Sequence, residues 1–305
     1  MSARGVLITG ATGFIGGHVV RSAMKRGDAV WVLSRDAQRA RRRLSCAVRV
    51  VGALAEIPAA ENIDAIVNLA GAPVIGPPWT RARRQLLIDS RVKTTAALLA
   101  WCAARVARPR VMVSASAIGF YGPSGDAWLD ESSPPQDVFQ SQLCRAREAA
   151  ADAAQDLGIR AVNLRIGLVL GADGGIFTRL ALPAKLGLAA RIGDGLQWMS
   201  WIHIDDLVRI IERALDDASM QGPINAVAPE PVRQGDFQRQ LTRALHRPLW
   251  LRIPAVALRL ALGEMAELLV QGQRVTPRRL LDAGFAFQHP ALPGALTDLV
   301  RPERS

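Results

Sequence analysis

The sequence has few of the cysteines that form disulfide frameworks or zinc sites. Its 305 residues include three cysteines, Cys46, Cys102 and Cys144, and no two of them form a CxxC pair. So sparse and odd a set argues against a disulfide framework or a zinc site, and it fits a reducing cytoplasm. No run of about 18 apolar residues occurs, so we expect no membrane-spanning helix. A predicted strand begins almost at the N-terminus, and we therefore expect no signal peptide.

Lysine is also scarce, although the chain is strongly basic. The formal net charge is +11, but only Lys25, Lys93 and Lys185 are lysines among the 38 basic residues. Such a preponderance of arginine indicates a compositional bias rather than a nucleic-acid-binding surface, despite basic clusters at 39–43 and 81–84. We expect the charge to attract an anionic phosphate ligand instead.

The amino end carries a glycine-rich turn between a predicted strand and a predicted helix. Residues 6–9 form a short apolar run, and Gly-Ala-Thr-Gly-Phe-Ile-Gly follows at 10–16. In such a strand–turn–helix, Gly10 permits the tight turn, Gly13 lets the backbone approach a pyrophosphate, and Gly16 lets the helix pack on the strand. The free N–H groups at the helix start would face the phosphates. The alternative is a tight turn with no ligand.

The end of the second predicted strand, at 30–33, indicates which dinucleotide binds. An acidic residue there would bond the ribose hydroxyls of NAD, but Ser34 and Arg35 come first, and the first acid is Asp36. A hydroxyl and a guanidinium suit the 2′-phosphate of NADP, because arginine binds phosphate through two hydrogen bonds. Arg39, one helical turn on, would assist. The alternative is a solvated arginine at a helix start.

Strands and helices alternate over the first half of the chain. Further strands are predicted at 47–51, 65–67, 110–113 and 160–164, and long helices at 80–104 and 138–157. This alternation predicts an α/β Rossmann fold with a doubly wound parallel sheet over 1–171, which also receives segments near 200–230. Beyond it, predicted helices at 177–186, 204–215, 233–245, 255–270 and 277–282 suggest a smaller, mostly helical substrate lobe over 172–305. The predicted apolar face of helix 80–104 consists of Leu86, Leu87, Val92, Ala96 and Leu99.

Several motifs resemble those of a known family. Alongside the glycine turn, the motifs are Asn-Leu-Ala-Gly at 68–71, Ser-Ala-Ser-Ala-Ile-Gly-Phe-Tyr-Gly at 114–122, Leu-Arg-Ile-Gly-Leu-Val-Leu-Gly at 164–171 and Trp-Ile-His-Ile-Asp-Asp at 201–206. They resemble the extended short-chain dehydrogenases/reductases. More narrowly, segments 68–73, 90–95, 197–206 and 263–277 resemble atypical epimerase-family oxidoreductases, which are NAD-dependent epimerase/dehydratase-like with a short C-terminal domain. The resemblance covers the whole chain and implies an NADP-binding protein, but it implies little about the substrate.

The resemblance also implies a set of cofactor contacts. The pyrophosphate cradle would consist of Gly10, Thr12, Gly13, Phe14, Ile15 and Gly16. Ser34 and Arg35 would hold the 2′-phosphate, with Arg39 beside them. Leu69, Ala70 and Gly71 would flank the adenosine side, Arg91 would face the nucleotide, and Ser114 and Leu168 would lie along the cofactor, Leu168 at its nicotinamide end. Relatives of this type often dimerise through the two long helices, so we expect a homodimer.

Catalytic residues of the parent family are partly missing. Its members use Tyr-x-x-x-Lys, in which lysine lowers the tyrosine pKa and tyrosine exchanges a proton with the substrate hydroxyl. The only tyrosine here, Tyr121, is followed four positions on by glycine, and aligning Glu148 with the family acid puts Gln140 and Cys144 at the tyrosine and lysine positions. Ser116 matches the family serine and would orient a carbonyl, or else cap a loop. Tyr121 would be a displaced acid, or else a packing residue.

The remaining candidates lie in or near the 201–206 motif. Trp198 and Trp201 would wall a substrate pocket or fill the domain interface, and His203 would shuttle protons or join the domains. Asp205 and Asp206 resemble a helix cap and a first-turn acid rather than metal ligands, so we expect no metal. Cys144, named above, would be reactive only if its pKa were lowered, and a buried inert thiol is the alternative.

Two functional hypotheses follow from these residues. The first is an NADP(H)-dependent oxidoreductase or epimerase acting on a small carbonyl or hydroxyl compound, with a nucleotide-sugar substrate suggested only by the label of relatives. The second is a non-catalytic NADP(H)-binding redox sensor or protein-interaction module, which the missing tyrosine–lysine pair supports. A nucleic-acid binder that uses the arginine clusters is a weaker third reading.

Overall fold

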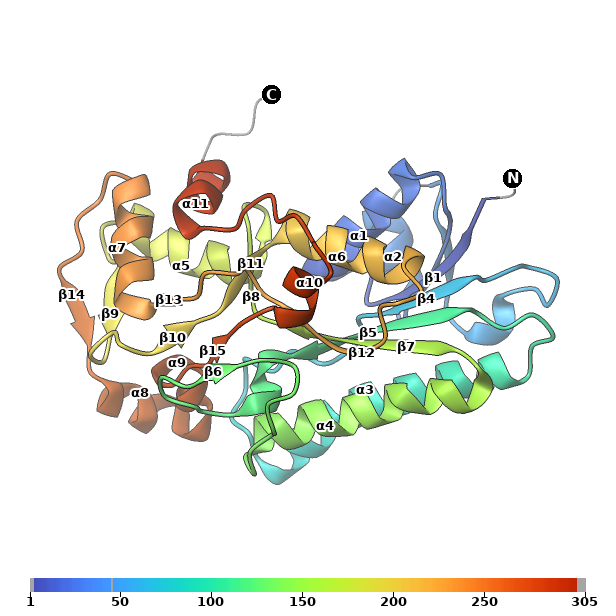
Figure 1. Ribbon diagram of the computed structural model, residues 1–305, viewed down its shortest axis with the longest axis horizontal. Coiled ribbons are helices and arrows are strands. Elements are labelled where there is room, and N and C mark those ends of the chain that lie inside the picture. Colours follow the sequence, from blue (N-terminus) through green and yellow to red (C-terminus); the bar gives the residue numbers. More distant parts are fainter. Residues whose placement is uncertain (1–2, 45, 301–305) are drawn as a thin grey trace.

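A seven-stranded parallel sheet forms the centre of the computed structural model, which describes residues 3–44 and 46–300 (Figure 1). Its strands run in the order β12-β7-β5-β4-β1-β2-β3, and every neighbouring pair is parallel. The strands are β1 (Gly5–Thr9), β2 (Ala29–Leu33), β3 (Arg49–Val51), β4 (Ala65–Asn68), β5 (Val111–Ala117), β7 (Arg160–Ile166) and β12 (Gly222–Ala226). The predicted doubly wound α/β fold is therefore confirmed. Residues 1–2 and 301–305 of the two predicted domains, and residue 45, lie outside the described part of the chain.

Helices cover both faces of this sheet, which explains its continuous apolar strands. On one face, α1 (Phe14–Lys25), α2 (Ala37–Arg43) and α6 (Ile204–Asp216) pack against alternate strand residues such as Val6 and Ile8. On the other face, α3 (Arg81–Ala103) and α4 (Phe139–Asp152) lie beneath the sheet (Figure 1), with Leu98 of α3 in the same cluster as Leu7 and Met112. The 3₁₀ turn Ala153–Leu157 ends the predicted helix 138–157.

The predicted apolar face of α3 is partly wrong. Leu86 is half exposed and Ala96 is exposed, whereas the buried residues of this helix are Leu87, Thr95, Leu98 and Cys102. A hydropathy pattern favours leucine over threonine, but the Thr95 hydroxyl accepts a hydrogen bond from Asn68 Nδ2 (2.9 Å) and donates to the Arg91 carbonyl (2.9 Å). A satisfied hydroxyl is tolerated in the core. The helix therefore turns a more polar face to the sheet than predicted.

The second lobe is less regular than the sheet. Its helices are α5 (Gly175–Lys185), α7 (Gln234–Ala244), α10 (Arg278–Asp282) and α11 (Leu292–Val300), and α11 was not predicted. The predicted helix 255–270 is three pieces, α8 (Ala255–Leu262), a 3₁₀ turn (Gly263–Ala266) and α9 (Glu267–Val270), because Gly263 adopts a positive φ of 57°.

Short strand pairs join segments within this lobe and join the lobe to the sheet domain. They are β8 (Leu168–Gly171) with β11 (Trp201–His203), β9 (Ala190–Ile192) with β14 (Leu251–Ile253), β10 (Trp198–Met199) with β13 (Val232–Arg233), and β6 (Trp128–Leu129) with β15 (Arg274–Val275). β6 lies in the loop between β5 and α4, and its pairing with β15 joins that loop to the C-terminal segment. Within the described ranges, no helix combines the length and apolarity that a bilayer crossing requires.

Candidate functional site

The glycine turn lies where the strand order reverses, between β1 and β4. Gly10 has a φ of 71°, and a Cβ there would lie 2.8 Å from the carbonyl carbon of Leu69. A Cβ on Gly16 would lie 2.3 Å from the Gly10 oxygen, so the helix contacts the turn through glycine. Gly13 is exposed, and its nearest obstacle is the Gly10 oxygen at 3.2 Å. It precedes α1 without a side-chain cap, so the first N–H groups of the helix are left for an anion.

Buried hydroxyl and amide groups hold the floor of this turn. The Thr9 hydroxyl donates to Asn68 Oδ1 (2.8 Å) and accepts from the Ala70 N–H (3.1 Å), which ties the end of β1 to the end of β4. Leu69 and Ala70 are consequently half-buried beside the turn, and Gly71 is exposed next to them. These positions agree with surfaces that a dinucleotide would cross.

Other residues of the predicted pyrophosphate cradle are partly buried. Thr12 and Ile15 are half-buried, and the Phe14 ring packs against the turn that joins β8 to α5, where a Cβ on Gly171 would lie 2.4 Å from it. At the end of β2, Ser34 donates to the Asp36 carbonyl (3.1 Å).

The basic side chains beside the turn come from the end of β2 and from α2. Arg35 and Arg39 are exposed there. Arg43, which was assigned no role, donates to the Thr12 carbonyl at 3.5 Å. The sequence signal that could have identified Arg43 was its position one helical turn after Arg39.

A cavity of about 340 Å³ opens at the carboxyl ends of β5 and β7, between the sheet and the second lobe. Of the predicted residues, the structure brings Ser116, Arg91, Leu168 and Trp198 together in its lining. Cys144 and Gln140 also line it, at the positions where the parent family carries lysine and tyrosine. The described residues of this lining include no aspartate or glutamate.

Ser116 is held by a buried charge pair. Its hydroxyl donates to Glu148 Oε1 (2.6 Å), and Glu148 accepts from Arg165 Nε (3.1 Å) and Nη2 (2.9 Å). Both partners of this ion pair are at most 9% exposed. Because the single proton of the hydroxyl points to Glu148, Ser116 presents an accepting lone pair to the cavity. The Cys144 thiol beside it is buried, and burial raises its pKa to about 11. This agrees with the hypothesis that Cys144 is a buried, inert thiol.

The structure does not support Tyr121 as a displaced acid. The 3₁₀ turn Ile118–Tyr121 carries its ring into the core, away from the cavity lining, and the side chain is fully buried. Its hydroxyl donates to Asn225 Oδ1 (2.6 Å) and accepts from Arg165 Nη1 (3.0 Å). Burial raises the pKa of Tyr121 to about 12. The packing alternative therefore describes this residue.

Two further candidates lie outside the cavity. Trp201 is fully buried in the core of the second lobe, where its Nε1 donates to the Glu230 carbonyl (2.9 Å), so it fills an interior and does not wall the pocket. Ser114 is 1% exposed in the middle of β5, because this strand is covered on both faces, and it does not reach a ligand-accessible surface. Trp198 does line the cavity, and its Nε1 donates to Asp126 Oδ1 (2.8 Å).

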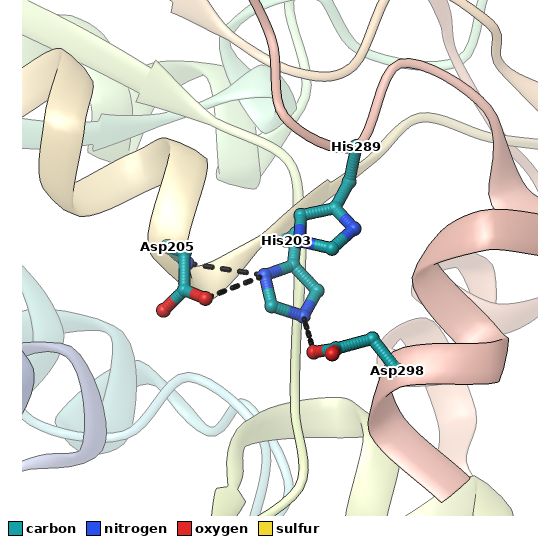
Figure 2. Close-up of side chains that lie close together, drawn as sticks. All are labelled: His203, Asp205, His289 and Asp298. Atoms are coloured by element: carbon teal, nitrogen blue, oxygen red, sulfur yellow. Dashed lines mark hydrogen bonds and ion pairs between the residues drawn. The ribbon is translucent and has the colours of Figure 1, made fainter. Parts of the chain in front are cut away.

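His203 belongs to a cluster that attaches the C-terminal segment to α6 (Figure 2). Its Nδ1 accepts the Asp205 backbone N–H (3.2 Å), so His203 itself caps the helix, and its ring stacks on His289 with the centroids 3.8 Å apart. Asp206 is fully buried and accepts the backbone N–H groups of Gln288 and His289, both at 2.8 Å. The cluster lies outside the cavity lining, which supports the joining role of His203 and not the proton shuttle.

The same cluster places four residues of metal-ligating types, two histidines and two aspartates, close together. Single donor atoms of His203, Asp205, His289 and Asp298 lie within 4.8 Å of one another. However, the helix cap requires a bare Nδ1 on His203, so the ring proton is on Nε2, which lies 3.4 Å from the Asp298 carboxylate. A metal at Nε2 would need that proton moved to Nδ1, and the cap would be lost. We therefore interpret the cluster as a tether.

The tether predicts a pH dependence of stability. Burial lowers the pKa of His203, and His289 lowers it further, against the opposing carboxylates of Asp205, Asp298 and Asp206. A histidine whose folded pKa lies below its unfolded value of about 6.5 favours the folded state above that pH, and this contribution is lost as the pH falls.

We expect His203→Asn, which keeps a capping oxygen, to remove this term. From about pH 7.5 to about pH 5.5 the wild type should lose about 1 kcal/mol more than the variant in urea unfolding. Parallel pH profiles would contradict the assignment.

The turn at the strand-order reversal, the doubly wound sheet and the cavity at the strand ends define a dinucleotide-binding α/β protein. The chain belongs to the NAD dependent epimerase/dehydratase family, whose sequence profile matches residues 6–226, and residues 253–299 match a domain of unknown function, DUF1731. This confirms the resemblance drawn from the motifs.

Relatives match over almost the whole chain. The epimerase family protein YfhF of Bacillus subtilis is 34% identical over 300 residues, which cover 97% of each chain. The chloroplastic SDR39U1 homolog of Arabidopsis thaliana is 36% identical over 97% of this chain and 86% of its own. Among solved structures, human epimerase family protein SDR39U1 (isoform 2), crystallised with NADPH, has a TM-score of 0.85 at 33% identity and covers 96% of this chain and 98% of its own.

Sequence reasoning missed one buried charge in the cavity lining, that of Arg147. The available signal was its spacing. Residues 143, 147 and 151 recur every four positions on α4, and all three are buried. A charged residue on the buried stripe of a helix is a candidate for function.

Proposed function

We propose that the chain is an NADP(H)-dependent oxidoreductase, or an epimerase that uses transient oxidation, acting on a small carbonyl or hydroxyl compound. The observation that carries this proposal is the position of the cavity, at the carboxyl ends of β5 and β7, which is the edge of the parallel sheet where the exposed Gly13 turn also follows β1. The turn fits a pyrophosphate, because a side chain at Gly13 would fill the space in front of the uncapped helix start. The NADPH in the human relative supports the choice of dinucleotide.

The chain's own residues would bind and orient the substrate. NADPH, when bound, supplies a hydride. Ser116, fixed by Glu148, would accept a hydrogen bond from a substrate hydroxyl and hold its carbon in one orientation. Since Tyr121 is buried and the Cys144 thiol stays protonated, the proton exchanged with the substrate oxygen would come from water or from the substrate.

Turnover with NADPH and a panel of aldehydes, ketones and quinones tests the proposal. In the reverse direction, oxidation of the matching alcohol with NADP⁺, Ser116→Ala should lower kcat/KM at least about tenfold, because it removes the hydrogen bond that Ser116 accepts from the substrate hydroxyl. Tyr121→Phe is the matched control, since it removes a buried hydroxyl outside the cavity; it should keep kcat/KM and lower stability by about 1 kcal/mol. Tight NADPH binding with no turnover would favour the sensor, which the glutamine and cysteine at positions 140 and 144 support.

The preference for NADP over NAD rests on Arg35. We expect Arg35→Asp to weaken NADPH binding about 30-fold and to leave NADH binding unchanged or stronger, because a charged hydrogen bond to the 2′-phosphate is replaced by repulsion. Arg39→Asp, on the same exposed surface, should have a smaller effect. Fluorescence titration of both nucleotides measures the change, and an equal loss for NADH would contradict it.

A further inference from the structure

The end of the cavity next to α3 and α4 contains two arginines that have no acidic partner within residues 3–44 and 46–300. Arg147 is 6% exposed, its Nη2 donates to the Asn68 carbonyl (2.7 Å), and its Nε has no hydrogen-bond partner among the described residues. Arg91 donates to the carbonyls of Leu87 (2.8 Å) and Ala72 (3.0 Å). Both guanidinium groups line the cavity, and each meets only neutral oxygens.

The next residue on the same helix shows what a paired charge looks like in this protein. Glu148 binds Arg165 through two hydrogen bonds, and neither side chain faces the cavity. Arg147 has no such counter-charge in the described part of the chain, and burial together with the Arg91 charge lowers its pKa to about 9. A buried cation without a partner is costly, and an anionic ligand would remove that cost.

The remaining walls limit what this anion can be. They are largely aliphatic, with Leu143, Ile166, Leu180 and Met199 among them, and glutamines together with Ser116 and Ser200 supply most of the other polar groups. Gln238 also lines the cavity, and its Oε1 is buried without a hydrogen-bond partner in the described chain. A compound with one anionic group and an apolar body matches the lining.

We propose that Arg91 and Arg147 bind the carboxylate of the substrate, which is an oxo acid or the corresponding hydroxy acid with an apolar chain or ring. The planar guanidinium groups suit a planar carboxylate. This inference rests on the proposed function for its chemistry. In the reductive direction, the carbonyl carbon takes a hydride as NADPH becomes NADP⁺, and the carbonyl oxygen takes a proton from water.

The experiment compares two probes that differ by the carboxylate, 2-oxo-4-phenylbutanoate and 4-phenylbutan-2-one. The wild type should reduce the acid with a kcat/KM at least about tenfold above the ketone. Arg147→Met should abolish that ratio, mainly through KM for the acid, while the Kd for NADPH stays within about threefold. Arg145→Met, an exposed arginine on the same helix, is the control that keeps the ratio.

Binding and stability measurements keep the proposal testable without turnover. Calorimetry with the unreactive acid 4-phenylbutanoate should show binding to the wild type and at least about tenfold weaker binding to Arg147→Met and Arg91→Met. Without ligand, Arg147→Met should melt above the wild type, because an unpaired buried charge has been replaced by an apolar chain.

Three results would overturn the assignment: equal use of acid and ketone by the wild type, no binding of 4-phenylbutanoate, or a variant that loses NADPH affinity instead. Binding of the acid without any NADPH binding would leave the anion site standing and reject the proposed function.

Discussion

Gly13→Asp is expected to weaken NADPH binding by about 10³-fold in a protein that still folds. The backbone at this position is extended, with φ of −79°, and a Cβ would meet only the Gly10 oxygen at 3.2 Å, so the substitution requires little rearrangement. The added carboxylate would lie against the pyrophosphate, and two charges about 4 Å apart near a protein surface repel by about 4 kcal/mol. Calorimetric titration with NADPH measures the loss.

Gly13→Ala separates charge from bulk in this experiment. It adds the same Cβ without a carboxylate, so we expect a loss of about tenfold or less and a melting temperature close to that of the wild type. Unchanged NADPH affinity in Gly13→Asp would place the pyrophosphate elsewhere and remove the basis of the proposed function.

Glu148→Ala should lower the free energy of unfolding by about 3–5 kcal/mol. The substitution leaves Arg165 buried and without its carboxylate, since the remaining acceptors of its Nη1 are the Tyr121 hydroxyl and the Glu131 carbonyl. It also removes the acceptor of the Ser116 hydroxyl, so turnover should fall together with stability. Urea unfolding followed by circular dichroism gives the first quantity.

A double-mutant cycle identifies the cause of that loss. Glu148→Ala with Arg165→Met removes both charges and should regain part of the stability lost in Glu148→Ala alone. The exposed pair of Arg278 and Asp282 on α10 is the matched control, and Asp282→Ala should cost less than about 1 kcal/mol. Additive single effects at Glu148 and Arg165 would show that the pair is not coupled.

Much of the sheet domain could be predicted because each of its strands and turns is marked by its own short stretch of sequence. The strands are buried on both faces and read as apolar runs, and the glycine turn combines a positive φ at Gly10 with close backbone contacts that exclude side chains. The lobe was less predictable. Helix α11 begins Leu-Pro-Gly, a poor helix former, and is held by its packing on α7. Two-residue strands such as β6 and β15 carry no periodic signal.

The residues of the candidate site likewise include some that the sequence predicts and others that it does not. The residues predicted for the cofactor follow strand ends that the sequence pattern marks, whereas the cavity is completed by residues far apart in sequence, such as Trp198 and Leu268. Tyr121 was considered as an acid because it follows the end of a strand, where active-site residues often lie. Only the direction of the 3₁₀ turn shows that its side chain is buried. Arg147 was overlooked because charged residues are usually solvated.

The sheet is completed by a strand that is made late. β12, at residues 222–226, covers the open edge of β7, although α5 and α6 of the chain come between them. While the chain leaves the ribosome, β7 can pair with β5, but its other edge therefore has no partner strand until more than two thirds of the protein has been synthesised. An uncovered strand edge invites pairing with other chains. The sheet of the nucleotide half is thus completed only after segments of the second lobe, such as α5, have been synthesised.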